Sequence, residues 1–299
     1  MSFNEGADLD TSQVTGGGGR GGARVGGGIG GVVILLIGAF FGVDLSSITG
    51  SQNPFDSSQV GAAGDSSDVD FSQCRTGADA NRDDTCRIIG TVNSVQDYWN
   101  DALPADVGRQ YRAAQTVIYS GATQSACGTA SNQTGPFYCP SDERIYMDAT
   151  FFDLLTSRFG ADDGALAQEY VVAHEYGHHV QNILGILAQS RDGSTGASSS
   201  GVRVELMADC LAGVWAHHAS TTEDADGTPL LEPLTEADVR SALSAAAAVG
   251  DDHIQASSGA TVNPDTWSHG SSEQRQRWFL TGYQQGTATR CDTFATDDL

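Results

Sequence analysis

The chain has 299 residues, of which 39% are hydrophobic, so it can bury one sizeable core and still leave room for tails. It contains 38 acidic residues and 15 arginines but no lysine, and its net charge is −23 at pH 7. This charge repels phosphate backbones and argues against nucleic acid as a partner.

The first 73 residues predict three segments that precede the folded domain. Residues 1–24 are rich in Gly, which predicts a flexible tail because glycine has no side chain to bury. Residues 25–43 carry no charge and are apolar, which predicts a transmembrane helix; at ~1.5 Å per residue they would span roughly 28 Å. Residues 44–73, rich in Ser, Asp and Gly, predict a solvated linker, and residues 74–299 are expected to form the folded domain.

The distribution of arginines predicts the orientation of the apolar segment in a membrane. Arg20 and Arg24 precede it and the next basic residue is Arg75, so we expect the N-terminus in the cytoplasm and the folded domain outside. A cleaved signal peptide and a buried core helix are the alternatives. No convincing small-x-small cleavage site follows the run, and so many glycines rarely precede a core helix, so we favour a single-pass anchor in the cell membrane.

Six cysteines follow the apolar run, and in an oxidising compartment they would pair as three disulfides. Proximity in sequence favours one pairing, although others stay open: Cys74 with Cys86, Cys127 with Cys139, and Cys210 with Cys291. A thiolate metal site is the competing interpretation. The sequence holds no Cys-x-x-Cys pair, the close spacing that structural zinc sites usually use, so we favour disulfides.

Local patterns predict one helix and two strands in the first part of the domain. Apolar residues recur at helical spacing over 91–103, and Pro104 is expected to end that helix. The short stretches Gln115–Tyr119 and Arg144–Asp148 are rich in Val, Ile and Tyr, which favours strands of a small sheet.

Helical patterns dominate the second part of the domain, where we expect helices at 163–187, 202–218, 235–249 and 271–285. Thr235 is the expected N-cap of the third helix, and Ser271 with Gln274 forms an expected capping box at the fourth. These elements predict an α+β domain with a small sheet and a mainly helical C-terminal part.

The sequence His174-Glu175-Tyr176-Gly177-His178 lies within the helix expected at 163–187. Residues four apart lie on one face of a helix, so His174 and His178 can share one metal ion. In zinc proteases with this spacing the two imidazoles bind Zn²⁺, and the carboxylate between them, here Glu175, deprotonates a zinc-bound water. The competing interpretation is a pair of surface histidines on an ordinary helix.

A catalytic zinc needs a third protein ligand and one open position. Glu205 and Asp209 lie four residues apart in an otherwise apolar helical stretch, so Glu205 is the expected ligand, and Asp209 is expected to accept a hydrogen bond from a ligand imidazole. An exposed Glu and a helix-stabilising Asp are the alternative. The three-histidine arrangement of metzincins is excluded, because Gln181 stands at their Gly and Leu184 at their third His.

The other histidines have less specific signals. His179 lies ~100° around the helix from His178, so it cannot share the ion and is expected to pack or to support a ligand; the pair His217 and His218 has the same limitation. His253 and His269 remain as sources of a donor that stabilises the oxyanion, and spacing alone does not decide between them.

Several blocks of this sequence resemble the bacterial neutral zinc metallopeptidases over nearly all of 74–294. They are GPFYCP at 135–140, HEYGHHVQ at 174–181, ELMADCLAG at 205–213, GDDHIQ at 250–255, HGSSEQRQRWFLTG at 269–282 and CDTF at 291–294. The resemblance implies a zincin-like fold in which a strand borders the cleft above the HExxH helix, together with membrane attachment through an N-terminal segment. It also implies zinc binding by His174, His178 and Glu205, with Glu175 as the base and Asp209 behind the ligands.

The resemblance favours His269 over His253 as the catalytic donor, because His253 stands where a basic residue such as Arg is usual in the family. The expected activity is hydrolysis of peptide or protein substrates. The alternative is a non-catalytic, zinc-stabilised binding or scaffold protein at the cell surface. Glu175 favours the enzyme, because a purely structural zinc site has no use for a base.

Overall fold

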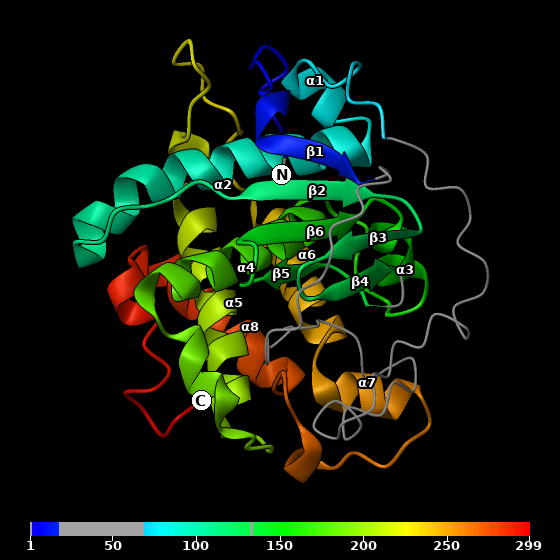
Figure 1. Cartoon of the computed structure of the whole chain (residues 1–299), viewed down its shortest axis with the longest axis vertical. Helices are drawn as coiled ribbons and strands as arrows, with labels where there is room; N and C mark the ends of the chain where they lie inside the picture. Colours follow the sequence, from blue (N-terminus) through cyan, green and yellow to red (C-terminus); the bar gives the residue numbers. More distant parts are fainter. Residues whose placement is uncertain (1, 18–68, 132–133) are drawn as a thin grey trace.

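The structure, a computed structural model, describes residues 2–17, 69–131 and 134–299. Its main sheet has four strands in the order β1-β2-β6-β5, with β1 and β5 at opposite edges (Figure 1). The strands β1, β2 and β6 run parallel, whereas β5 is antiparallel to β6. Their bounds are Val14–Gly17 (β1), Gln115–Tyr119 (β2), Phe137–Cys139 (β5) and Arg144–Asp148 (β6); Ala122–Ser125 (β3) and Gly128–Ser131 (β4) form a separate antiparallel pair.

Helices make up most of the remaining described chain. The α-helices are Gly77–Ala80 (α1), Asp84–Val107 (α2), Phe151–Ser157 (α3), Ala165–Leu184 (α4), Ser200–His218 (α5), Glu236–Ala248 (α6), Asp251–Ser257 (α7) and Ser272–Gln285 (α8). Short 3-10 helices cover Thr11–Gln13, Leu187–Asp192, Ala219–Thr221, Pro264–Thr266 and Ala288–Arg290. The α+β class with a small sheet and a mainly helical C-terminal part is therefore confirmed.

Local signals located most elements closely. Strands β2 and β6 have the predicted bounds, and each of the four later helices lies within about two or three residues of its prediction. Ser271 Oγ accepts a hydrogen bond from the Gln274 amide at 3.1 Å, and Gln274 Oε1 accepts one from the Ser271 amide at 2.9 Å. The predicted capping box of α8 is thus confirmed, as is Thr235 as the N-cap of α6.

The prediction that Pro104 ends the first helix is wrong, because α2 continues to Val107. Proline lacks an amide hydrogen, so at this position it deprives only the Asn100 carbonyl of its helical partner. Asn100 is exposed, so water can hydrogen-bond that carbonyl. The helix ends instead at Gly108, whose φ of 66° is the left-handed conformation that glycine adopts without strain.

The long helix α4 packs against α2, α5 and α6, which makes it the centre of the helical part. Gly177 allows α5 to approach α4 closely: a Cβ atom there would lie 3.0 Å from the Cα and carbonyl oxygen of Ala208. Gly282 of α8 does the same for α5, since a Cβ atom would overlap the Cys210 carbonyl oxygen. Because these two glycines have no side chain, α4, α5 and α8 can pack closely against one another.

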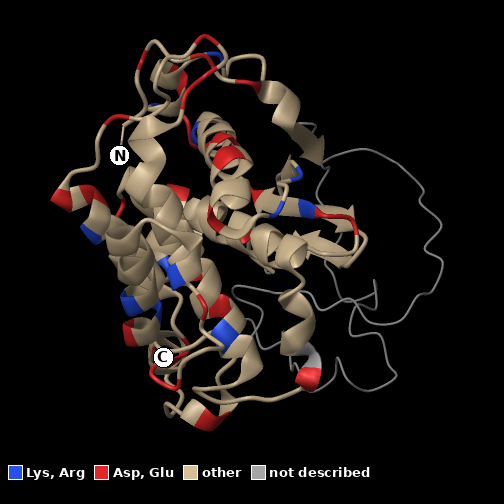
Figure 2. Ribbon diagram, turned by 90° about the vertical axis from the view of Figure 1, so that its left-hand side faces the viewer, with Lys and Arg blue, Asp and Glu red and all other residues tan. Residues whose placement is uncertain are grey.

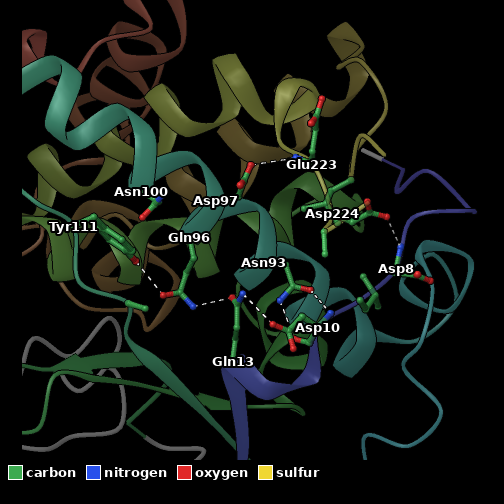
Figure 3. Close-up of a pocket in the computed structure, with 14 residues that line it drawn as sticks. Asp8, Asp10, Gln13, Asn93, Gln96, Asp97, Asn100, Tyr111, Glu223 and Asp224 are labelled. Atoms are coloured by element: carbon green, nitrogen blue, oxygen red, sulfur yellow. Dashed lines mark hydrogen bonds between the residues drawn. The ribbon is translucent and has the colours of Figure 1, made fainter. Parts of the chain in front are cut away.

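Residues 2–17, predicted as a flexible tail, instead belong to the folded domain. The Phe3 side chain is 1% exposed and lies over Gly90 of α2. Asp10 and Asn93 exchange two hydrogen bonds of 2.9 Å, and Gln96 Nε2 donates to the Gln13 side chain at 2.8 Å (Figure 3). Beside these contacts lies a cavity of about 610 Å³, which is lined by both the N-terminal segment and α2. Composition missed this segment because its partners lie about a hundred residues away.

The predicted single-pass membrane topology is wrong. Strand β1 pairs in parallel with β2, so 14–17 and 115–119 lie in one sheet and on the same side of any membrane. One crossing at 25–43 would put them on opposite sides. No helix in the described ranges is long and apolar enough to cross a bilayer, and the segment 25–43 itself lies outside them, as does most of the predicted linker.

The six cysteines form three disulfides, with the pairing that proximity in sequence favours. Cys74–Cys86 ties the start of α2 to the preceding turn, and Cys127–Cys139 joins the β3–β4 connection to the edge strand β5. Cys210–Cys291 links α5 to the C-terminal segment over a sequence separation of 81. The third bond closes the longest loop and so restricts the unfolded chain most.

Acidic residues are distributed over many helices and loops of the described chain, whereas basic residues are few (Figure 2). Among the described residues a few carboxylates are nevertheless buried, and three of them, Glu175, Glu205 and Asp209, lie on α4 and α5 where these helices pack together. Unlike the solvated carboxylates on the surface, these buried carboxylates need a charged or hydrogen-bonding partner.

Candidate metal centre

Helix α4 and helix α5 bring three potential metal ligands together. His174 and His178 are four residues apart on α4, and Glu205 faces them from α5. His174 Nε2 lies 3.3 Å from one Glu205 carboxylate oxygen and His178 Nε2 lies 3.5 Å from the other. One ligand atom of each residue lies within 4.8 Å of the other two, so the three can hold one metal ion. All three side chains are buried, at 0–3% exposure.

The outer nitrogen of each imidazole is held by an oxygen. His174 Nδ1 lies 2.8 Å from Asp209 Oδ1, and His178 Nδ1 lies 2.9 Å from the side-chain oxygen of Gln181. Both oxygens only accept, so both Nδ1 atoms carry the proton and the Nε2 lone pairs point into the shared space. Neither Nε2 atom has a hydrogen-bond partner among the residues that the structure describes. Buried polar atoms without partners are costly, and a cation between them would satisfy both.

The ionisation of His178 and Glu205 also suits a cation, whereas Asp209 outweighs burial and raises the pKa of His174 to about 9, so a proton competes with a cation for that imidazole. Burial lowers the pKa of His178 to about 4, which keeps that imidazole neutral. Burial would raise the pKa of Glu205, but the neighbouring His178 and His174 outweigh it and hold that pKa well below its usual range. A neutral imidazole and an ionised carboxylate are the forms that bind metal. The donor set of two nitrogens and one carboxylate is one that zinc accepts with a fourth position open.

Glu175 lies next to the ligand His174 but does not join the ligand group. It is fully buried, and within the described part of the chain neither carboxylate oxygen has a hydrogen-bond partner. Burial raises the pKa of Glu175 to about 8. At that pKa the group is mostly protonated near neutral pH, and a cation held by the neighbouring ligands would lower the pKa and favour the carboxylate that can accept a proton.

A family comparison agrees with this geometry. A sequence model of the family described as "Putative neutral zinc metallopeptidase" matches residues 5–294. This chain belongs to that family. The match confirms the resemblance found in the motifs, and membership of a zinc metallopeptidase family implies zinc as the metal of the His174, His178 and Glu205 group.

Relatives of this chain occur in Mycobacterium tuberculosis and in Escherichia coli. The protein Rv2575 of Mycobacterium tuberculosis is 49% identical over 302 residues, and the match covers 100% of both chains. The protein YpfJ of Escherichia coli K12 is 34% identical over 269 residues, which are 88% of this chain and 85% of that protein. Both relatives are described as uncharacterized proteins. No solved structure gives a significant match, so the zincin-like arrangement stays a prediction.

Asp209 lies behind His174, where the sequence predicted it, and it is itself held by Arg275 of α8. The Arg275 Nε and Nη2 atoms donate to the two Asp209 oxygens at 2.8 and 2.9 Å, and Nη2 also donates to the Tyr170 hydroxyl at 3.2 Å. Burial alone would raise the pKa of Asp209, but the Arg275 and His174 charges lower it. The carboxylate therefore stays ionised and fixes the orientation of His174.

Sequence reasoning missed Arg275, although a signal was present. Arg275, Trp278, Phe279 and Gly282 are the buried residues of α8 and follow the spacing of one helical face. An arginine on an apolar stripe indicates a buried charge, which requires a buried carboxylate nearby. Gln181, which sequence reasoning used only to exclude metzincins, is the second omission, since it orients His178.

His269 lies at the start of α8, near the ligand group, and Asp251 holds it. The Asp251 Oδ2 atom accepts the backbone amides of Ser268, His269 and Gly270 at 2.7–3.0 Å, and Oδ1 lies 3.1 Å from His269 Nδ1. Burial lowers the pKa of His269, but Asp251 outweighs it and raises that pKa to about 9. The charge of His269 is also one of the smaller causes that lower the pKa of Glu205.

The other histidines point elsewhere. His253 Nε2 bonds the Phe159 carbonyl at 3.0 Å, and His217 and His218 bond carbonyls of the segment that ends α8. His179 is buried and contacts Tyr138 and the Arg112 carbonyl, which fits the packing role expected for it. The role of His269 in catalysis stays a prediction.

We predict that Asp251→Asn lowers the free energy of unfolding by about 1–3 kcal/mol at neutral pH, because the amide cannot accept all four hydrogen bonds. The fold lowers the pKa of Asp251 below the ordinary value of 3.8, so its contribution is present above that value and is lost as pH falls through the folded pKa. Urea unfolding of both proteins should show a gap at neutral pH that narrows in acid. A gap of constant size down to strongly acidic pH would contradict this.

Proposed function

We propose that this protein is a zinc-dependent peptidase that hydrolyses peptide bonds in peptide or protein substrates, with Glu175 as the general base. The observation that carries the proposal is the meeting of three buried, partnerless ligand atoms with a buried carboxylate outside the ligand group. A structural zinc site would close its fourth position with another protein ligand and would not need this carboxylate. Family membership supports the same reaction class.

In this proposal zinc, held by His174, His178 and Glu205, supplies Lewis-acid polarisation of water and of the scissile carbonyl. The Glu175 carboxylate takes a proton from the attacking water and delivers it to the leaving amine nitrogen. Asp209 and Gln181 keep the ligand imidazoles in the tautomer with a free Nε2 lone pair. Burial of the site excludes bulk water, which strengthens every charge interaction there.

Strand β5 supports the binding of an extended peptide. It lies at the edge of the sheet and packs against α4, the helix that carries Glu175. In the described ranges β5 pairs with β6 on one side and with no strand on the other, so its other side can hydrogen-bond a substrate main chain. An added strand would then pass close to the metal centre. This is the role that the family resemblance implies for a strand above the HExxH helix.

We predict that His269→Ala lowers turnover by ~10²–10³-fold with zinc content nearly unchanged, because it removes one donor to the oxyanion without removing a ligand. The melting temperature should fall, because the variant also removes the buried partner of Asp251. KM should change comparatively little. Steady-state kinetics and metal analysis on the same preparations measure this. The matched control is His253→Ala, which removes a histidine bonded to Phe159 and should turn over almost normally. Normal turnover in His269→Ala with a crippled His253→Ala would show that the wrong histidine was chosen.

A peptide library incubated with the purified chain tests the proposed function. We expect cleavage at defined bonds, its loss after a chelator removes the metal, and its return on addition of zinc. A zinc-loaded protein that cleaves nothing across varied peptides and conditions would instead support the non-catalytic, zinc-stabilised binding protein.

A further inference from the structure

Tyr138 is the middle residue of the edge strand β5 and faces the opposite way from its neighbours. The Tyr138 ring is fully buried in the core that includes Tyr176 and Val180 of α4. Phe137 and Cys139 belong to a separate cluster on the other face of the sheet. The alternation of a strand thus aims one side chain of β5 at the helix that carries Glu175.

The Tyr138 hydroxyl forms hydrogen bonds with two side chains of α4. It lies 3.1 Å from His179 Nδ1 and accepts from Asn182 Nδ2 at 3.0 Å. His179 Nε2 lies 2.6 Å from the Arg112 carbonyl, which only accepts, so Nε2 carries the proton. Nδ1 of the neutral ring then accepts from the Tyr138 hydroxyl.

In this network each group donates a hydrogen bond to the next one, in the order Asn182, Tyr138, His179 and the Arg112 carbonyl. Asn182 Nδ2 also lies 3.4 Å from Glu143 Oε1, and Glu143 pairs with the Arg112 side chain at 3.0 Å. Each of the three bonds in the network therefore has a defined donor, and none can reverse without leaving a buried group unpaired. The network fixes the position of β5 relative to α4.

The hydrogen-bond network contacts the face of α4 that carries Glu175, the proposed base. Glu175 and His179 are four residues apart on α4, so they lie on neighbouring turns of one face. A shift of β5 relative to α4 would thus change both the place of a bound peptide and the surroundings of the base.

We propose that Tyr138 is a positioning residue. The hydrogen bonds of its hydroxyl to His179 and Asn182 fix β5, the proposed peptide-binding strand, in the position relative to Glu175 that hydrolysis requires. This inference rests on the proposed peptidase function. Errors of about 1 Å in such placement cost up to ~10²-fold in rate, even when the mutation lies away from the reacting atoms. The hydroxyl therefore matters for turnover more than for binding of the metal.

The test is Tyr138→Phe, which removes the hydroxyl and keeps the ring. We expect kcat to fall roughly ten- to a hundredfold with zinc content unchanged and a smaller change in KM. Amide hydrogen exchange should become faster in β5 but not in α5 or α8. The matched control is Tyr146→Phe on the neighbouring strand β6, whose hydroxyl bonds Asp142 at 2.7 Å, away from α4. That control should leave kcat close to wild type.

The outcomes separate the two proposals. If wild type and control cleave peptides and Tyr138→Phe does so at the same kcat, the positioning role is wrong. If Tyr138→Phe only lowers the melting temperature, the hydroxyl is merely structural and the inference is overturned. If the wild type cleaves no peptide, the proposed function fails, and the inference that rests on it is overturned with it.

Discussion

Glu175→Gln is expected to lower the rate of peptide cleavage by about 10²–10⁴-fold while the protein keeps its zinc. The amide has the size of the carboxylate but cannot take a proton from water, and Glu175 lies outside the group of ligand atoms. Loss of a buried carboxylate without a hydrogen-bond partner should also leave the fold intact. Steady-state kinetics, metal analysis and thermal melting on one preparation measure all three quantities.

Helix α4 offers a matched control for this substitution. Glu169 is also fully buried, but its charge interacts with Arg87 of α2 and Asp238 of α6 rather than with the ligand group. Glu169→Gln makes the same chemical change on the same helix and should retain both zinc and turnover. If Glu175→Gln lost its zinc, the division of roles between base and ligands would be wrong.

Glu205→Ala is expected to abolish stoichiometric zinc binding and, with it, turnover. Removal of a partner behind a ligand typically costs 10–100-fold in metal affinity, and we expect loss of a ligand itself to cost more than ~100-fold. The wild-type melting temperature should fall when a chelator is added, because zinc binds only the folded state, whereas the variant should not respond. Zinc content after dialysis and melting with and without chelator measure the effect.

The exposed Glu273 in the first turn of α8 provides the control for charge. Glu273→Ala removes one carboxylate outside the metal centre and should keep full zinc occupancy. Stoichiometric zinc in dialysed Glu205→Ala would remove Glu205 from the ligand group and would leave the third ligand to be found elsewhere.

The ligand group could be predicted because its signals are local. A spacing of four residues fixes the relation of His174 to His178 before any tertiary structure is known, and the same holds for Glu205 and Asp209. Capping residues such as Ser271 act within one turn and were predicted for the same reason. What spacing could not give is the approach of α5 to α4, which depends on close contact at Gly177.

The incorrect predictions concern segments that are far apart in the sequence and meet in the fold. Strand β1 is short and half glycine, so it has no strand signal of its own, and only its pairing with β2 makes it part of the sheet. The apolar run at 25–43 predicted an anchor from hydropathy alone, and hydropathy does not report on which side the flanking segments fold. Arg275 was missed because its partner Asp209 lies 66 residues away.

Anomalous diffraction at the zinc edge from crystals of the full chain tests the central claim most directly. We expect one zinc peak bordered by His174 Nε2, His178 Nε2 and a Glu205 oxygen, with no fourth protein ligand and with Glu175 facing the open position. The absence of zinc from this site, or a fourth side chain that completes its coordination, would contradict a catalytic zinc centre.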